Sequence, residues 1–175
     1  DGRIYVADFY NHRVQPFSKN YSALPQIGKK GRILGGNFDY PTDVAVGPDD
    51  SLYVADAYNN RIQKFSPEGK FVTKWGGFLG TGLKGDSSGS FDVATGIEVD
   101  AQGRVYVADF YNNRIQIFNS DGDFRVEFGM QGSDPGEFER PTDMTVDSHG
   151  NIYVVDFGNN RIQKFSPLTS QTEHD

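Results

Sequence analysis

The chain has 175 residues, of which 36% are hydrophobic, 14% aromatic and 23% charged, with a net charge of −7 and a pI of about 4.9. This composition is typical of one globular domain, and its acidity argues against phosphate binding as the main function. Cysteine is absent, which excludes disulfides, a catalytic thiol and cysteine-based zinc sites, and no apolar run approaches the length of a membrane span.

One string of residues recurs four times and organises the chain. The copies are YVADFYNHRVQPF from Tyr5, YVADAYNNRIQKF from Tyr53, YVADFYNNRIQIF from Tyr106 and YVVDFGNNRIQKF from Tyr153. Aligned on their first Asp, the copies are spaced by 48, 53 and 47 residues, a period typical of a solenoid, a propeller or another repeat array.

Each copy predicts a β-hairpin, because an apolar run ending in Asp and a second run beginning with Arg flank a four-residue loop. The loop ends in Asn-Asn, or in Asn11-His12 in the first copy, and Asn tolerates the left-handed backbone of such loops. Asp and Arg would face each other across the two strands. A catalytic group is needed once, whereas these charges recur in every copy, so we assign them a structural role. The pairs are Asp8 with Arg13, Asp56 with Arg61, Asp109 with Arg114, and Asp156 with Arg161.

Further strands flank the hairpins and complete a four-stranded antiparallel meander. In chain order, the units are a partial unit 1–30 with strands from Arg3, from Arg13 and around 24–27, complete units 41–76 and 94–129, and a partial unit 141–166, followed by a polar tail 167–175. The first unit lacks its first strand and the last unit lacks its last strand. The chain starts at Asp1-Gly2 inside a repeat, which predicts that an upstream segment has been removed.

The strings LYVADAYNNRIQKFSPEG and PTDMTVDSHGNIYVVDFGNNRIQKF closely resemble NHL repeats, and the resemblance extends from Gly2 to about Ser166. It implies an all-β fold, a β-propeller with blades around a central channel, usually six in that family. An open arc of about three and a half blades would be a fragment of a longer propeller or would close its ring by self-association. The resemblance also implies a non-catalytic platform that binds a protein or peptide, and it favours the extracytoplasmic sensor or scaffold part of a microbial protein. In ubiquitin ligases and receptor kinases of this family, an attached module does the chemistry, and this chain contains none.

The connection between the second and third units is longer than the others. The step from Gly76 to Ala94 is 18 residues, against 13 from Gly28 to Pro41 and 12 from Gly129 to Pro141. The segment 80–90 is rich in Gly and Ser and is predicted to be mobile. We favour a tolerated insertion over a binding loop, so that deletion of 81–90 should leave stability nearly unchanged. Lys84 and Asp86 are its candidate binding residues.

Aromatic residues in the hairpin loops give the second set of candidate binding residues. They are Phe9, Tyr10, Tyr58, Phe110, Tyr111 and Phe157. A ring of blades would display them in a circle at one end, where they could bind protein or instead pack between blades, and the sequence leaves both alternatives open.

Enzymatic chemistry and RNA binding are the competing classes. Propeller lyases and lactonases hold a metal with several histidines, but this chain has only His12, His149 and His174, which we interpret as turn and tail residues. Asp49-Asp50 and Asp121-Gly122-Asp123 do not supply a full calcium loop. Some animal NHL propellers bind RNA, and Lys29-Lys30-Gly31-Arg32 lies near Phe38 and Tyr40, yet the acidic composition argues against RNA. We therefore predict no catalytic residue, no metal, no cofactor, no membrane insertion and a protein or peptide partner.

Overall fold

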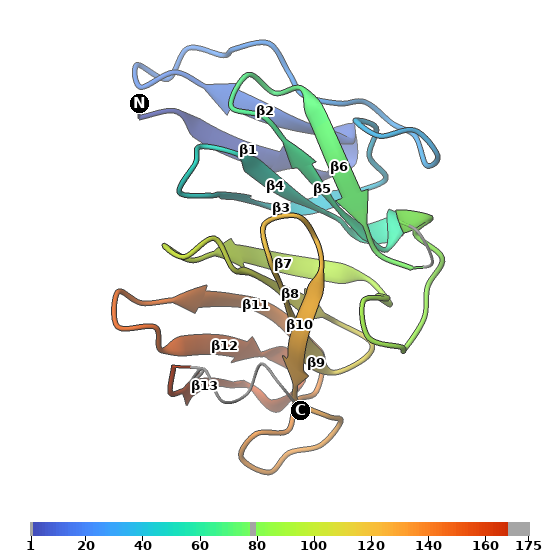
Figure 1. The fold of residues 1–175 in the computed structure, drawn as a ribbon, viewed down its shortest axis with the longest axis vertical. Helices are drawn as coiled ribbons and strands as arrows, with labels where there is room; N and C mark the ends of the chain where they lie inside the picture. The colour runs from blue at the N-terminus through green and yellow to red at the C-terminus, as the bar shows by residue number, and fades with distance from the viewer. Residues whose placement is uncertain (1, 78–79, 168–175) are drawn as a thin grey trace.

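The structure, a computed structural model, describes residues 2–77 and 80–167. Within these ranges thirteen strands form four antiparallel sheets (Figure 1). The strands are β1 (Ile4–Asp8), β2 (Arg13–Phe17), β3 (Pro41–Val46), β4 (Leu52–Asp56), β5 (Arg61–Phe65), β6 (Phe71–Trp75), β7 (Ala94–Val99), β8 (Val105–Asp109), β9 (Arg114–Phe118), β10 (Phe124–Phe128), β11 (Pro141–Val146), β12 (Ile152–Asp156) and β13 (Arg161–Phe165).

Each sheet is a meander in which consecutive strands pair. The middle sheets run β3-β4-β5-β6 and β7-β8-β9-β10, and the end sheets are β1-β2 and β11-β12-β13. In each repeated hairpin the Asp that ends one strand pairs directly with the Arg that begins the next. The prediction of an all-β fold built from four-stranded antiparallel blades is confirmed.

The first sheet corrects the predicted strand count of this unit. The strand expected around 24–27 is reduced to two isolated bridges, Phe17 to Ala23 and Val14 to Ile27. Pro25 lies between these bridges and has no N–H to donate, so a continuous ladder with β2 cannot form there. The side-chain amide of Gln15 instead donates to the Leu24 carbonyl at 2.8 Å.

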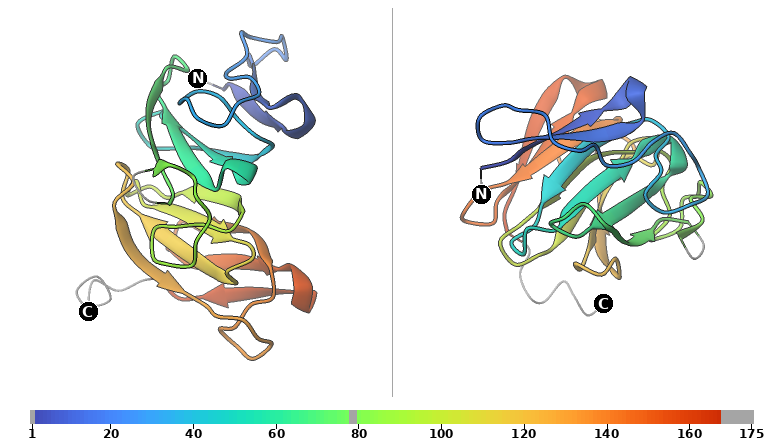
Figure 2. Two further views of the ribbon diagram at one scale, coloured as in Figure 1. Left: turned by 90° about the vertical axis from the view of Figure 1, so that its right-hand side faces the viewer. Right: turned by 90° about the horizontal axis from the view of Figure 1, so that it is seen from above.

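The sheets stack face against face along an open arc, from β1-β2 at one end to β11-β12-β13 at the other (Figures 1 and 2). The first strands of neighbouring sheets, β3, β7 and β11, lie side by side. Three apolar clusters fill the three junctions between sheets, each built from the facing strands and a fully buried phenylalanine of the connecting loop. These phenylalanines are Phe38, Phe91 and Phe138.

Two glycines are required where the connecting loops begin. Gly28 and Gly129 have positive φ angles of 82° and 95°, and a Cβ on either would collide with the ring of Phe38 or Phe138. The sequence therefore places Gly where each buried ring crosses the end of the preceding sheet.

Candidate functional site

The hairpin turns of all four sheets and the loops that connect neighbouring sheets lie at the same ends of the strands, and we call the surface that they form the hairpin-turn face. Three hairpins contain a short 3-10 turn: Phe9–Asn11, Ala57–Asn59 and Phe157–Asn159. The residue that follows each turn is left-handed, as the Asn pairs predicted. Backbone bonds join the turns to the loops, as in Tyr58 N–H to the Asp39 carbonyl at 3.1 Å.

A buried network holds the hairpin of the second sheet. The Asp56 carboxylate accepts hydrogen bonds from Arg61 Nε, Asn59 Nδ2 and Gln63 Nε2, each at 2.8 Å, and from the Asp39 N–H at 2.7 Å. Asp56 and Arg61 are both 0% exposed. Burial raises the pKa of Asp56, and the hydrogen bonds of Asn59, Asp39 and Arg61 oppose that rise. Because every partner donates, the arrangement suits an ionised carboxylate.

The network also forms hydrogen bonds to the loop that precedes β3. Arg61 donates through Nη1 to the Arg32 carbonyl and through Nη2 to the Asn37 carbonyl, both at 2.8 Å. Asn59 donates to the Gly31 carbonyl at 2.9 Å. The third and fourth sheets repeat these bonds with Arg114 and Arg161. The Asp-Arg pairs therefore hold the loops of the hairpin-turn face in place.

A glutamine completes each of these networks and was missed by our sequence analysis. Gln63 donates to the Asn37 carbonyl at 2.7 Å and accepts from the Gly36 N–H at 2.8 Å. Gln116 and Gln163 make equivalent bonds. The signal was present in the sequence, since Gln stands two residues after the Arg in all four copies.

The second residue of each Asn pair joins neighbouring sheets, a role beyond that of a turn former. Its side chain accepts the N–H of the residue that precedes the next sheet, at 2.8–3.0 Å: Val93 to Asn60, Arg140 to Asn113, and Tyr40 to His12 Nδ1. His12 thus replaces the usual Asn as an acceptor and is buried. The equivalent Asn160 lies exposed at the open end of the arc.

Half of the predicted aromatic residues gather between the first two sheets. Phe9, Tyr10 and Tyr58 surround Tyr40, whose ring centroid lies 4.8 Å from that of Phe9 and 5.0 Å from that of Tyr58. Phe9 is half-buried, whereas Tyr10 is 82% and Tyr58 54% exposed. Of the two alternatives, packing thus fits Phe9 and display fits the tyrosines. Our sequence analysis named Tyr40 only beside the basic cluster and not among the aromatic binding residues. Tyr40 directly precedes Pro41, the first residue of β3.

The remaining aromatic candidates lie farther along the arc. Phe110 and Tyr111 contact each other edge to face, with centroids 4.8 Å apart. Tyr111 and Phe157 are exposed. They extend the aromatic character of the hairpin-turn face over the third and fourth sheets.

The inserted connection contacts the hairpin of the second sheet, and its extra residues lie between Gly76 and Gly85. The Gly85 carbonyl accepts from Asn112 as the Gly31 carbonyl accepts from Asn59, so 85–90 correspond to the loop in other units. The Gly82 carbonyl accepts from Asn60 Nδ2 at 3.3 Å, and a Cβ on Gly82 would collide with the Asn59 carbonyl oxygen. The insertion is therefore seated on the hairpin of the second sheet.

Hydrogen bonds to the second half of the connection change the effect that we expect from deleting 81–90. Arg114 and Gln116 donate to backbone carbonyls within 87–90, and the deletion would remove these acceptors. Replacing 77–84 with Met-Gln, as in the connection after Gly129, should change the free energy of unfolding by less than about 1 kcal/mol. Deleting 85–90 should cost about 2–4 kcal/mol, since buried donors lose their partners. Urea titration of both variants tests the distinction, and equal losses would contradict it.

The insertion, the hairpin of the second sheet and the loop before it line an open pocket of about 420 Å³. Its lining includes Arg32, Ile33, Tyr58, Lys74, Leu83 and Lys84. Of the predicted binding residues, Tyr58 and Lys84 thus come together in one site, whereas Asp86 is exposed outside the lining. Ile33, Lys74 and Leu83 were missed, and Arg32 was considered only for RNA binding, because these residues meet only through the packing of separate loops and a strand.

The residues considered for RNA binding do not form a face that combines basic side chains with exposed aromatic rings. Phe38 is fully buried in the core and cannot stack on a base. Arg32 Nε forms an ion pair with Asp39 at 2.9 Å. Lys29 and Lys30 are exposed.

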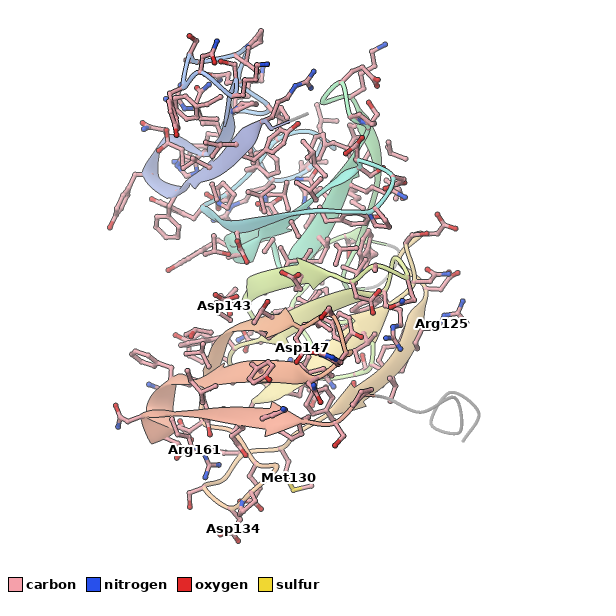
Figure 3. The ribbon with its side chains drawn as sticks, turned by 90° about the vertical axis from the view of Figure 1, so that its left-hand side faces the viewer. Arg125, Met130, Asp134, Asp143, Asp147 and Arg161 are labelled. Carbon is pink, nitrogen blue, oxygen red and sulfur yellow. The ribbon has the colours of Figure 1, made fainter. Side chains whose placement is uncertain are left out.

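The residues considered for metal binding lie in turns. The Asp49 carboxylate accepts from the Ser51 N–H and hydroxyl, and Asn119 binds the N–H groups of Asp121 and Asp123. His149 lies exposed in the turn after β11, whose Asp147 is labelled in Figure 3, and His174 falls outside the described residues. Among residues 2–77 and 80–167, no group of three His, Asp or Glu side chains is arranged to hold a metal ion.

Acidic residues project from the inner strands of three sheets. Asp43 on β3 accepts the Ile97 N–H of β7 at 2.9 Å, and Asp143 lies where β11 runs beside β7 (Figure 3). Burial, together with the negative charges of Asp43, Asp143 and Asp100, raises the pKa of Glu98 on β7 to about 7. These carboxylates give the inner edge of the arc an acidic character.

In the part of the chain that the structure describes, no helix has the length and apolar character needed to cross a membrane.

Two protein-family models match different parts of the chain. The model of DUF5128, described as a 6-bladed beta-propeller, matches residues 94–174, and the NHL repeat model matches 1–17 and 38–65. Protein lin-41 of Caenorhabditis elegans is 49% identical over 49 residues, and Protein brain tumor of Drosophila melanogaster is 44% identical over 45 residues. These matches cover 28% and 26% of this chain and 4% of each relative.

Solved structures show the same fold. Virginiamycin B lyase from Staphylococcus aureus superposes with a TM-score of 0.65 at 17% identity, over 97% of this chain and 53% of the lyase. Hydrazine synthase of Kuenenia stuttgartiensis gives 0.64 at 13% identity, over 94% of this chain and 46% of that chain. The chain spans about half the length of these structures, and at such identities the likeness is one of fold alone. The four copies of the repeat fold as the hairpins of four stacked sheets, and the matching models describe an NHL repeat and a 6-bladed beta-propeller, so the chain carries NHL repeats in a β-propeller fold.

Proposed function

We propose that the hairpin-turn face is a non-catalytic surface that binds a segment of another protein. The observation that carries this proposal is that most of the large apolar side chains that are more than half exposed, among the described residues, lie on this one face; Tyr21, Val72 and Ile162 are the exceptions. Those on this face are Tyr10, Ile33, Leu34, Tyr58, Leu83, Tyr111, Met130 and Phe157. Exposed aromatic and aliphatic residues gathered on one face are typical of protein interaction surfaces.

The rigidity of the loops supports the same proposal. Arg61 donates to backbone carbonyls of the preceding loop, and Arg114 and Arg161 do the same in their sheets. A surface whose loops are already fixed loses little conformational entropy on binding, which favours recognition of a peptide. The repeated charges serve this structural purpose, and we assign none of them to catalysis.

RNA binding is supported less. The candidate stacking residue Phe38 is buried in the core. Nucleic-acid surfaces combine a basic patch with exposed aromatic rings, and the net charge of −7 works against such a patch.

Selection from a phage-displayed library of random peptides tests the proposal. Wild-type protein should enrich a shared set of peptides, and the double variant Tyr10→Ala/Tyr58→Ala should bind them at least about tenfold more weakly. Tyr21→Ala is the matched control, because Tyr21 is equally exposed but lies in the turn after β2, at the opposite end of the sheet. Failure to enrich any peptide, or unchanged affinity of the double variant, would contradict the proposal.

A further inference from the structure

We infer that the pocket between the insertion and the hairpin of the second sheet receives an acidic side chain, Asp or Glu, of the bound peptide. This inference rests on the proposed function and adds a specificity to it. The pocket lies where the longer connection 76–94 breaks the repeat symmetry.

The charged residues of the pocket lining all have the same sign. The lining contains Arg32, Lys74 and Lys84 and, among the described residues, no carboxylate. They come from three segments: the loop before β3, strand β6 and the insertion. A concave site lined by one sign of charge concentrates ligands of the opposite sign.

Lys74 lies in the wall of the pocket. Burial and then the positive charge of Arg61 lower the pKa of Lys74, and the negative charge of Asp56 opposes them. Lys74 Nζ donates to the Ile33 carbonyl at 2.9 Å, which holds the ammonium group at the pocket wall. A carboxylate entering the pocket could accept hydrogen bonds from the remaining ammonium hydrogens.

The other two cationic side chains, Arg32 and Lys84, each form an ion pair with an aspartate. Arg32 pairs with Asp39 at 2.9 Å, and Lys84 pairs with Asp92 at 3.2 Å, while the side chains of Arg32 and Lys84 remain 76% and 71% exposed. The anchoring acids lie outside the pocket lining. They orient the two cations and leave donor groups of each side chain available to a ligand.

The apolar residues of the lining point to a peptide as the source of this carboxylate. Ile33 and Leu83 are exposed on either side of the pocket, and Tyr58 links it to the aromatic residues around Tyr40. A peptide with an acidic residue beside aliphatic or aromatic residues complements this surface. Three cations, two of them with acidic partners, are few for the phosphate backbone of a nucleic acid.

Charge reversal in the peptide selection tests the inference. Peptides selected on the wild type should be enriched in Asp and Glu, and Lys84→Glu and Lys74→Glu should each weaken their binding by about tenfold or more. A library selected on Lys84→Glu should favour Lys and Arg instead. Lys70→Glu is the control, since Lys70 is exposed in the turn between β5 and β6, at the other end of the sheet. Circular dichroism verifies that each variant is folded.

The outcomes separate this inference from the proposed function. Peptides that depend on Tyr58 but carry no acidic preference would overturn the inference and leave the proposed function standing. Tighter binding of single-stranded RNA or of a phosphopeptide than of the selected acidic peptides would also overturn it. If no peptide is enriched at all, both fail.

Discussion

Replacing Arg61 with alanine should lower the free energy of unfolding by about 3–5 kcal/mol, because it leaves the buried Asp56 carboxylate without its charge partner. The guanidinium and the carboxylate are both 0% exposed and 2.8 Å apart. The same change removes the donors that hold the loop carbonyls of Arg32 and Asn37. Urea titration followed by circular dichroism measures the loss.

Arg161 provides the matched control, because it makes the same pair in the last sheet with more solvent access. Its side chain is 30% exposed, and its Nε lies 2.7 Å from Asp156. Burial disfavours ionisation of Asp156, but the hydrogen bonds from the Glu139 N–H, Asn159 and Arg161 outweigh it and lower the pKa. Arg161→Ala should cost about 1–2 kcal/mol, since removal of this partly exposed side chain lets water reach the buried Asp156 carboxylate. Equal losses for the two variants would show that burial of the pair does not set its contribution.

Replacing Glu98 with glutamine should stabilise the protein above neutral pH and reduce the pH dependence of its stability. Glu98 has a pKa of about 7 in the folded chain, raised from 4.5 by burial and then by Asp43, Asp143 and Asp100. A raised pKa means that the folded state holds the proton more tightly. The contribution of Glu98 is therefore fully present below about pH 4.5 and is lost as the pH rises through about 7.

Because Glu98 is only about half buried, solvent screening reduces the gain expected for Glu98→Gln at about pH 8 to roughly 1–2 kcal/mol. Urea titrations between about pH 5 and pH 8 should show a flatter profile for Glu98→Gln than for the wild type. Asp86→Asn is the control, since Asp86 is exposed on the inserted loop. An unchanged profile for Glu98→Gln would mean that Glu98 is not held among like charges.

The fold could be predicted because its determinants are local and repeated. The run ending in Asp56, the Asn pair and the run beginning with Arg61 fix the register of one hairpin, and three more copies do the same. The strand around 24–27 was overpredicted, because the apolar pattern of Leu24 and Ile27 outweighed the missing donor of Pro25 in our interpretation. Because proline has no backbone N–H to donate, Pro25 by itself indicates that this segment does not form a continuous strand.

The candidate site was predicted less completely, for a reason that lies in the loops. Tyr58 and Lys84 could be singled out, one as a hairpin aromatic and the other as part of an insertion. Their meeting with Lys74 and Ile33 depends on how Gly82 seats against Asn60, a tertiary contact without a sequence period. Phe38 was considered as a surface ring for the same reason, although it fills the core between two sheets.

The most direct test of the account is to map where a selected peptide binds on the isotope-labelled chain by NMR chemical-shift perturbation. We predict that the shifts concentrate on the hairpin of the second sheet at 57–60, on the loop at 32–34 and on the insertion at 81–84, with a smaller response around Tyr10. The turns at the opposite end, 66–70 and 119–123, should stay unchanged. Perturbations centred on those turns, or on the acidic inner edge around Asp43 and Glu98, would contradict the assignment of binding to the hairpin-turn face.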